Sequence, residues 1–309
     1  MSVQLVTIGH ILNETIIFAD GARKGPVLGS PAAYSSVVTA RLGISTGIVT
    51  KVGSDAPSNL LQPLKDAGVD FGGIYFGDST TTNELVYAPN GNKKLRYLKQ
   101  ASPITHKDIP ISYHQAQAFY ICPLNYEVSL ETVSEIARLG NLMATDLGGY
   151  GGVHVNQKTY IQNKMSPSKM KELISFFDIV KASDEDCKML FSDENLTEEE
   201  SAKRLIDWGA DIGIITMGSK GSLVFTQKSR HHIPSIKGRV IDVTGGGDSY
   251  MGGFLTEFIR TGDIYKSAIF ASAVALCVIE ETGGVRASRM PGEAEARERI
   301  PRGLEPELV

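Results

Sequence analysis

Short apolar segments alternate with longer amphipathic segments along most of this chain, and this alternation restricts the fold more than any other feature of the sequence. The short segments are rich in β-branched residues, as buried strands are, whereas the long ones repeat apolar residues at helical spacing. Strands that alternate with helices are typical of a mostly parallel sheet with helices on both faces, so we predict an α/β fold. Strands are expected at Leu5–Ile8, Thr46–Val52, Ala118–Ile121, Leu142–Asp146, Ile179–Ala182, Ile212–Met217 and Ser222–Thr226. Helices are expected at Ala32–Leu42, Asn59–Ala67, Leu130–Leu139, Lys169–Phe176, Glu198–Trp208, Ser249–Arg260 and Tyr265–Glu280.

The composition favours a soluble globular protein of the cytoplasm. The 309 residues are 42% hydrophobic and 21% charged, which is enough to build a sizeable core. The net charge of −4 gives no basic surface for nucleic acid. No apolar run is long enough to span a bilayer, and the N-terminus lacks a signal-peptide pattern. The three cysteines are widely spaced, which disfavours a disulfide framework or a structural zinc site and favours a reducing compartment.

Residues 72–101 interrupt the alternation, because they show no helical period. Their pattern predicts a strand, a polar turn, a second strand, a turn at Pro89–Asn92 and a third strand. An all-β insertion in an α/β chain forms a lid, a subunit contact or a plain surface hairpin. We expect a lid.

Polar and glycine-rich segments follow several of the predicted strands. Ligands of open α/β sheets bind beyond the carboxyl ends of the strands, so these segments predict a ligand site at one edge of the sheet. The acidic residues of this set could instead favour the dipole at a helix N-terminus. The segments are Asp146 with the following LGGYGG, Ser183–Asp186, Thr216 with Gly218 and Gly221, and Gly245–Asp248.

The segment VTGGGDSYMGGF (Val243–Phe254) carries the most specific signal. The preceding Gly238–Val243 reads as a strand and the following residues as a helix, so the three glycines form a turn at a helix N-terminus. The N–H groups of such a turn bind anions well. A carboxylate at Asp248 would repel an anion unless it has a separate task, such as taking the proton of an alcohol during phosphoryl transfer. The simpler alternative makes Asp248 the helix N-cap.

Other nucleotide and metal motifs are missing from the sequence. It has no GxxxxGK[ST] P-loop, no GxGxxG after the first strand and no HExxH. A P-loop ATPase, a dinucleotide-dependent oxidoreductase and a zinc hydrolase are therefore disfavoured.

The chain resembles the ribokinase-like (PfkB) family of carbohydrate kinases over nearly its whole length. Asp242–Phe254 is similar to the C-terminal signature of that family, and Gly29–Gly43 resembles its N-terminal glycine pair with the following helix. Lys51–Asp70 and Ile215–Phe225 match further family patterns. The resemblance implies one domain over residues 1–309, a three-layer α/β/α sandwich with a small β-sheet lid from about 11–28 and 72–101, and the use of ATP and Mg²⁺.

The resemblance also implies roles for individual residues. Asp248 would be the catalytic base, and Gly245, Gly246 and Gly247 the anion hole, with Asp186 serving Mg²⁺. Nucleotide-binding residues would be Thr216, Gly218, Gly221, Thr244, Ser183, Ala271 and Ala275. Substrate-binding residues would be Asn13, Glu14, Gly29, Ser30, Tyr34, Asn83 and Asp146. The chain departs from the family pattern at Ser30 in the glycine pair, Tyr34 in place of asparagine, Glu14 in place of aspartate, Ser183–Asp186 in place of NxxE and Gly246 in place of alanine.

The predicted reaction is ATP-dependent phosphorylation of a hydroxyl group on a sugar or cyclitol. GHILNE, DLGGYGG and TGGVRASRMP are most similar to a branch that contains myo-inositol kinases, so myo-inositol is the leading single substrate. A hexose, a pentose or a nucleoside is the alternative within the family. A catalytically silent homologue that binds polyol or nucleotide is the alternative outside enzymes. A homodimer that forms through the lid is a further expectation.

Overall fold

A ten-stranded sheet forms the centre of the molecule. The computed structural model describes residues 2–87, 93–304 and 307–308, and its large sheet has the strand order β14-β13-β12-β11-β10-β9-β8-β1-β4-β5. The strands from β11 to β5 run parallel, whereas β12, β13 and β14 are antiparallel to their neighbours at one edge. The mostly parallel sheet predicted from the alternation is confirmed. The strands are β1 (Leu5–Ile8), β4 (Thr46–Gly53), β5 (Asp70–Gly77), β8 (Ala118–Ile121), β9 (Leu142–Asp146), β10 (Ile179–Ser183), β11 (Ile212–Thr216), β12 (Ser222–Phe225), β13 (Arg230–Ile233) and β14 (Glu307–Leu308).

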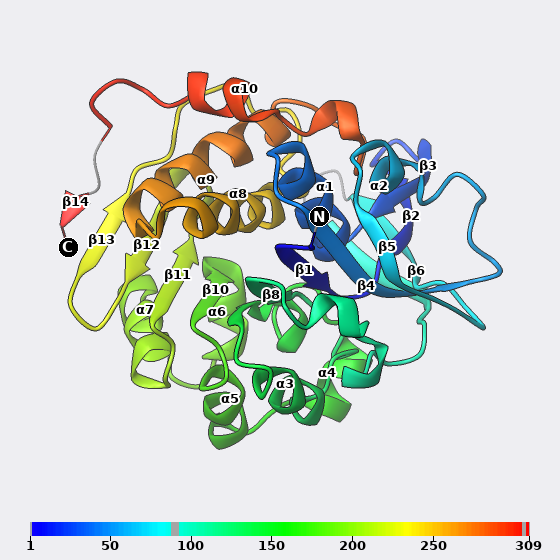
Figure 1. Cartoon of the computed structure of the whole chain (residues 1–309), viewed down its shortest axis with the longest axis horizontal. Helices are drawn as coiled ribbons and strands as arrows, with labels where there is room; N and C mark the ends of the chain where they lie inside the picture. The colour runs from blue at the N-terminus through cyan, green and yellow to red at the C-terminus, as the bar shows by residue number, and fades with distance from the viewer. Residues whose placement is uncertain (1, 88–92, 305–306, 309) are drawn as a thin grey trace.

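Helices cover both faces of this sheet, as Figure 1 shows. One face packs against α1, α2, α8, α9 and α10 through a buried apolar cluster that includes Phe254 and Phe270. The opposite face packs against α3, α5, α6 and α7 through a second cluster that includes Val133 and Leu205. Two cores separated by one sheet are the expected consequence of strands that are apolar on both faces. The helices are α1 (Pro31–Arg41), α2 (Gln62–Asp66), α3 (Leu130–Ala137), α4 (Gln157–Asn163), α5 (Pro167–Ile174), α6 (Asp184–Leu190), α7 (Glu198–Asp207), α8 (Gly246–Thr261), α9 (Ile264–Ile279) and α10 (Glu293–Glu298).

A second, four-stranded sheet lies at the β4–β5 side of the large one (Figure 1). Its strand order is β3-β2-β6-β7, with β2 and β6 parallel and the outer pairs antiparallel. The strands are β2 (Leu12–Ile17), β3 (Arg23–Gly29), β6 (Thr82–Tyr87) and β7 (Lys93–Lys99).

The first residues of the predicted β insertion belong to the large sheet. Residues 72–77 are part of β5, which pairs with β4 in the large sheet, so the expected boundary of the small sheet at residue 72 is wrong. The hydrogen bonds to β4 continue the parallel sheet through this segment. The turn predicted at Pro89–Asn92 lies outside the described residues.

The segment Gly238–Val243 is not the strand that its alternating pattern predicts. The N–H groups of Ile241 and Asp242 donate to the carbonyl oxygen of Ile279, at 2.8 and 3.1 Å. The segment thus bonds to the last turn of α9 instead of a strand, and its apolar side chains Val240, Ile241 and Val243 are largely exposed. By contrast, the local signal at α7 is confirmed, because Thr197 and Glu200 form a reciprocal capping box.

Within the residues that the structure describes, no helix combines the length and the apolar character needed to cross a bilayer.

Candidate active site

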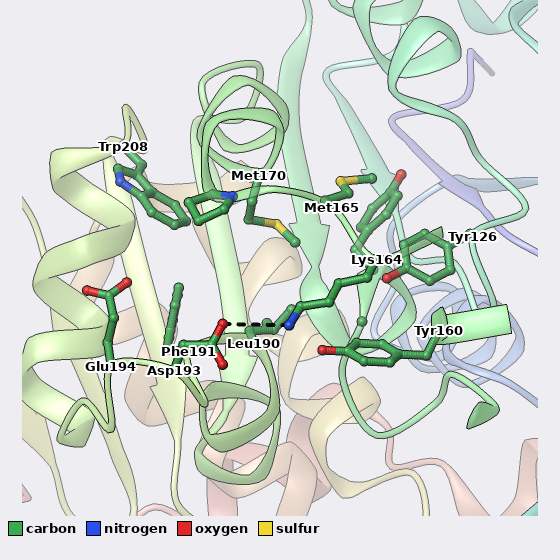
Figure 2. Close-up of a pocket in the computed structure, with 13 residues that line it drawn as sticks. Tyr126, Tyr160, Lys164, Met165, Met170, Leu190, Phe191, Asp193, Glu194 and Trp208 are labelled. Atoms are coloured by element: carbon green, nitrogen blue, oxygen red, sulfur yellow. Dashed lines mark ion pairs between the residues drawn. The ribbon is translucent and has the colours of Figure 1, made fainter. Parts of the chain in front are cut away.

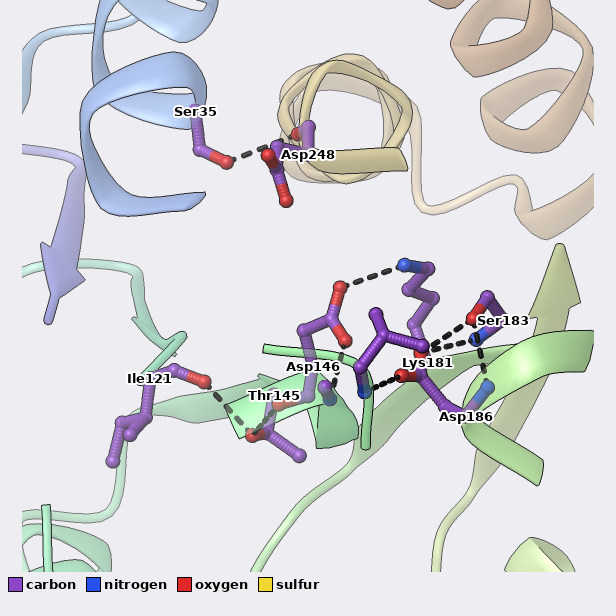
Figure 3. A network of polar contacts seen from close by, with 10 residues as sticks. Ser35, Ile121, Thr145, Asp146, Lys181, Ser183, Asp186 and Asp248 are labelled. Carbon is purple, nitrogen blue, oxygen red and sulfur yellow. Dashed lines mark hydrogen bonds and ion pairs between the residues drawn. The ribbon is translucent and has the colours of Figure 1, made fainter. Parts of the chain in front are cut away.

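The predicted site residues gather at one edge of the large sheet, where the parallel strands β9, β10 and β11 end. Asp146 is the last residue of β9 and is paired in register with Lys181 of β10. Ser183 ends β10 and is paired with Thr216, which ends β11. The N-terminus of α8 lies beside this edge (Figure 3). The grouping predicted from the carboxyl ends of the strands is therefore present.

The glycine turn before α8 needs glycine most strictly at Gly245. This residue is the N-cap of α8 and has a φ of 80°, which side-chain-bearing residues rarely adopt. A Cβ atom at Gly245 would also collide with the ring of Tyr34. Tyr34 is 2% exposed and its hydroxyl accepts a hydrogen bond from Arg289. The side chain is thus packed against the turn, and the contact of Tyr34 with substrate stays a prediction.

Three backbone N–H groups of the turn are available to an anion, but they are not the three predicted. The N–H of Gly246 donates to the carbonyl oxygen of Val243 at 3.1 Å. The N–H groups of Gly245, Gly247 and Asp248 have no acceptor within the described part of the chain. The first N–H groups of a helix lack partners inside the helix and carry its positive dipole end. Within the described residues, the N–H groups that the protein leaves free for an anion are thus those of Gly245, Gly247 and Asp248.

Asp248 does not cap α8. The N-cap is Gly245, and Asp248 is the third residue of the helix. Figure 3 shows its side chain pointing from α8 toward the pair formed by Asp146 and Lys181. The Ser35 hydroxyl donates to the backbone oxygen of Asp248 at 3.0 Å, which fixes this turn of α8 against α1. The simpler alternative from the sequence, a helix N-cap, is wrong.

Burial raises the pKa of Asp248 to about 6. The positive charge of Lys181 and the nearby His154 lower the pKa, whereas the negative charges of Asp146 and Asp186 raise it further. The side chain is 8% exposed. A carboxylate with a pKa near 6 is ionised at pH 7 yet basic enough to accept a proton from a reacting group, as a general base requires.

Lys181 is the site residue that sequence reasoning missed. Its ammonium group forms an ion pair with Asp146 at 2.7 Å, and both side chains are at most 5% exposed. A Cβ atom built on Gly247 would lie 3.0 Å from Lys181 Nζ, so the ammonium group lies directly beside the glycine turn. Burial lowers the pKa of Lys181, but the negative charges of Asp146 and Asp186 outweigh burial and the net shift is upward. A lysine in the otherwise apolar strand IVKAS was the available signal.

Each carboxylate oxygen of Asp146 accepts a hydrogen bond from another group of the protein. One carboxylate oxygen accepts a hydrogen bond from the N–H of Gly148 at 2.9 Å, and the other pairs with Lys181. Asp146 therefore holds Lys181 in place, and its contact with substrate stays a prediction.

Asp186, the predicted magnesium residue, closes a capping box at the start of α6. One oxygen accepts hydrogen bonds from the N–H and the hydroxyl of Ser183, at 2.8 and 2.7 Å, and the other accepts one from the N–H of Val153 at 2.9 Å. Burial raises the pKa of Asp186, but nearby Lys181 and these hydrogen bonds lower it, and the net shift is downward. Both oxygens already have protein partners. In residues 2–87, 93–304 and 307–308, no three His, Cys, Asp or Glu side chains form a cluster that could hold a metal ion.

The predicted nucleotide residues divide into accessible and inaccessible ones. Gly218 and Gly221 form the turn after β11 with φ values of 56° and 92°. A Cβ atom at Gly221 would collide with the backbone of the β13 end. Ala275 on α9 is partly exposed, whereas Ala271 is completely buried against α8. The prediction for Ala271 is therefore wrong, because the close packing of α8 and α9 encloses its side chain.

The predicted substrate residues of the small sheet form one polar pair. The amide nitrogen of Asn83 on β6 donates to Glu14 on β2 at 2.9 Å, and both side chains are buried. Asn83 Oδ1 is buried and has no hydrogen-bond partner within the described chain. Gly29 lies against Glu14, since a Cβ atom there would be 3.4 Å from Glu14 Oε2. Asn13 precedes Glu14 on the same strand and is partly buried.

Ser30 has a different task from the one predicted. It caps α1, its hydroxyl accepting a hydrogen bond from the N–H of Ala33 at 3.1 Å. Its φ of 110° is unusual for a residue other than glycine. Ser30 therefore occupies a position where the family pattern has glycine, with its hydroxyl committed to α1.

Two tyrosines connect the small sheet to the segments beside Asp248. The hydroxyl of Tyr87 on β6 lies 3.3 Å from the hydroxyl of Thr244, which precedes the glycine turn. The hydroxyl of Tyr97 on β7 donates to the carbonyl oxygen of His154 at 3.0 Å. These contacts place the small sheet over the edge that carries Asp248.

A separate cavity of about 60 Å³ lies beside helices α4, α5 and α6 (Figure 2). Tyr126, Tyr160, Phe191 and Trp208 are among its lining residues, and none of the predicted site residues lines it. Pockets for small-molecule ligands usually enclose roughly 300–1,000 Å³. This cavity can hold a few water molecules but no sugar or nucleotide, so it is not the substrate site.

Comparisons with known proteins show similarity over most of the chain. The sequence profile of the pfkB family of carbohydrate kinases matches residues 5–290. The cytidine kinase of Thermococcus kodakarensis is 29% identical over 262 residues, which cover 84% of this chain and 89% of that protein. Among solved structures, fructokinase with bound ATP from Xylella fastidiosa is 20% identical, with a TM-score of 0.80 and coverage of 97% and 98% of the two chains. A variant of a pyrophosphate-dependent myo-inositol-1 kinase is 22% identical, with a TM-score of 0.73 and coverage of 96% and 98%.

Proposed function

The chain belongs to the pfkB family of carbohydrate kinases, and from this premise we propose that it transfers the γ-phosphoryl group of ATP to a hydroxyl group of a small sugar-containing molecule. One observation carries the proposal. A buried carboxylate with a pKa near 6, Asp248, lies in the same helix turn as N–H groups that have no acceptor among the described residues, and it points toward a buried lysine (Figure 3). This arrangement suits phosphoryl transfer, in which a base acts on the alcohol while positive groups stabilise the phosphoryl oxygens.

The reaction uses these groups as follows. Asp248 accepts the proton of the acceptor hydroxyl as its oxygen forms a bond to the γ-phosphorus. The bond between that phosphorus and the bridging oxygen of ADP breaks, and ADP leaves. The charge on the transferred oxygens faces the N–H groups of Gly245 and Gly247 and the ammonium group of Lys181. Asp146 keeps that ammonium group in place by its ion pair.

Mg²⁺ would neutralise charge on the β- and γ-phosphates when it is bound with ATP. Mg²⁺ keeps several waters and usually takes one or two carboxylates together with phosphates. The buried carboxylates Asp146 and Asp186 beside Lys181 give this edge an acidic character that fits such an ion. Because the Asp186 oxygens already have protein partners, we expect ATP to supply most of the ligands, with Asp186 helping to hold the ion.

We favour a nucleoside as the acceptor. The support is the cytidine kinase of Thermococcus kodakarensis, which aligns with this chain over 84% of its length. The myo-inositol kinase resembles this chain at 22% identity, which speaks only to the fold. The myo-inositol predicted from the sequence therefore stays a prediction. Glu14 and Asn83 would contact the hydroxyl groups of either acceptor.

A phosphorylation assay with a panel of acceptors tests the proposal. The panel contains cytidine, other ribonucleosides, ribose, fructose and myo-inositol, each with ATP and Mg²⁺, and product is measured as ADP and as phosphorylated acceptor. We expect transfer to at least one nucleoside with the largest kcat/KM. Transfer to myo-inositol in preference would overturn the nucleoside assignment but keep the kinase. If no acceptor is phosphorylated while ATP still binds, the chain is a silent homologue.

A further inference from the structure

Arg289 is a fully paired cation buried behind the glycine turn. It ends a short 3₁₀ turn, Ala287–Arg289, and is 3% exposed. All five of its N–H donors have acceptors. Four donate to backbone carbonyl oxygens, those of Val278, Gly284, Asp242 and Thr244 at 3.1, 3.0, 3.5 and 3.1 Å, and one donates to the Tyr34 hydroxyl at 2.9 Å.

The acceptors of Arg289 come from four separate segments. Asp242 and Thr244 lie in the loop that leads into the glycine turn, and Val278 lies near the end of α9. The Tyr34 ring, held by the same guanidinium, packs against Gly245. The conformation of the anion-binding turn therefore depends on one positive charge at its rear.

The charge of Arg289 is balanced mainly by carbonyl oxygens. Within the described segments, no carboxylate forms an ion pair with Arg289; the Asp242 carboxylate bonds to the N–H of Thr244 and the hydroxyl of Thr282 instead. Backbone carbonyl oxygens that converge on a positive charge are also the arrangement by which proteins hold K⁺. A guanidinium group that belongs to the chain can balance these carbonyl oxygens in place of an ion from solution.

We propose that Arg289 is an internal cation that positions the glycine turn, so that phosphoryl transfer by this chain needs no monovalent cation from solution. This inference rests on the proposed kinase function. Arg289 acts as a positioning residue, because its guanidinium contacts the backbone and Tyr34, away from the reacting groups. A buried carbonyl cluster that lost this charge would repel itself, and the turn would shift away from the phosphoryl group.

The first test uses the unaltered protein. Phosphorylation of the acceptor with the largest kcat/KM is measured with ATP and Mg²⁺ in a tetramethylammonium buffer free of Na⁺, K⁺ and NH₄⁺. KCl is then added at constant ionic strength. We expect turnover to change by less than about twofold. A rise of tenfold or more on addition of KCl would overturn the inference and leave the kinase function intact.

The second test uses Arg289→Ala, with Arg289→Lys as the conservative variant. A displacement of about 1 Å in catalytic groups can cost on the order of 10²-fold in rate, so we expect a loss of that size in kcat for the alanine variant. Millimolar guanidinium or K⁺ should restore at least tenfold of it, and Arg289→Lys should keep most activity. The matched control is Arg286→Ala, because this exposed arginine lies in the same loop and pairs with Glu281.

The control separates a specific effect of guanidinium from a general one. We expect Arg286→Ala to keep normal turnover and to be unchanged by millimolar guanidinium or K⁺. Failure of both ions to restore turnover to Arg289→Ala, or an equal rise in the turnover of Arg286→Ala, would overturn the inference. If Arg289→Ala does not fold, the salt titration of the unaltered protein decides. If the unaltered protein phosphorylates nothing in any salt, the proposed function fails. In that case the statement about phosphoryl transfer falls with it, and the melting temperature decides only whether Arg289 positions the turn. We expect millimolar guanidinium to raise the melting temperature of Arg289→Ala and not that of Arg286→Ala, and no difference between the two variants would overturn the positioning role.

Discussion

The glycine turn and the small sheet meet where Tyr87 contacts Thr244, yet they are stabilised in opposite ways. Behind the turn, Arg289 has a partner for each of its five donors, and Lys181 has Asp146. In the small sheet, Asn83 is completely buried and its Oδ1 has no partner within the described residues.

The difference indicates what each region does before substrate binds. Groups that stabilise developing charge work best when they are fixed in advance, because they then cost no reorganisation during the reaction. A buried acceptor without a donor costs on the order of 1–3 kcal/mol, and a ligand hydroxyl would relieve that cost. We therefore expect the charged side chains of the phosphoryl side to be held in place by the protein alone, whereas the acceptor completes the hydrogen bonds of the acceptor side. Four predictions can break or sharpen this comparison.

The largest effect is expected for Asp248→Asn. The amide keeps the shape of the side chain but cannot take the proton, and general-base assistance is typically worth about 10²–10⁴-fold in kcat. ATP binding, measured by calorimetry, should stay within a few-fold. Asp184→Asn, at a partly exposed acidic residue of α6 paired with Lys188, serves as the control and should keep normal turnover. An Asp248→Asn enzyme within threefold of the parent would contradict the assignment of the base.

The second effect tests the preformed phosphoryl side through Lys181→Gln. Loss of one charged donor at a developing oxyanion typically costs on the order of 10²-fold or more in kcat. Removing one partner of a buried pair also leaves Asp146 uncompensated, at about 3–5 kcal/mol in the free energy of unfolding. Adding Asp146→Asn should recover stability in urea titrations but not kcat. Recovery of both would mean that the lysine serves folding alone.

The third effect concerns the acceptor side through Asn83→Ala. A site built on hydrogen bonds loses affinity when a polar partner is removed, so we expect KM for the acceptor to rise about 10- to 100-fold. The KM for ATP should change by less than twofold, because Asn83 lies in the small sheet. Leu98→Ala, at an exposed position of β7, is the matched control. Equal changes in both KM values would show that the small sheet does not act on the acceptor alone.

The smallest effect is the dependence on pH. Because burial raises the pKa of Asp248 to about 6, kcat/KM for the acceptor should fall as pH drops through 6, by about fourfold at pH 5.5. The free energy of unfolding depends on pH with the opposite sign. A carboxylate whose pKa is raised in the folded state contributes to stability below its unfolded pKa. That contribution is lost as the pH rises through 6. Asp248→Asn should therefore raise the melting temperature more at pH 8 than at pH 4. A kcat/KM that stays constant from pH 8 to pH 5 would rule out a base with this pKa.

The sequence by itself determined the elements and the edge at which they converge. Strands such as Leu5–Ile8 and Leu142–Asp146 have the predicted bounds, because alternating apolar segments have few ways to bury both faces. Local signals of a few residues were equally informative: Thr197 with Glu200 capped a helix as expected. The grouping of Asp146, Ser183 and Thr216 followed from the rule that parallel strands end together.

Only the tertiary structure decided which polar groups already bond to other residues of the protein. Asp146 and Tyr34 were predicted to bind substrate, but Lys181 and Arg289 use them. Arg289 follows Tyr34 by 255 positions in the chain, and no local pattern encodes a bond over that separation. The apolar alternation of Gly238–Val243 likewise predicted a strand, but the segment bonds to the end of α9. Local pattern sets the preference of a segment, whereas its hydrogen-bond partners depend on which distant segment packs beside it.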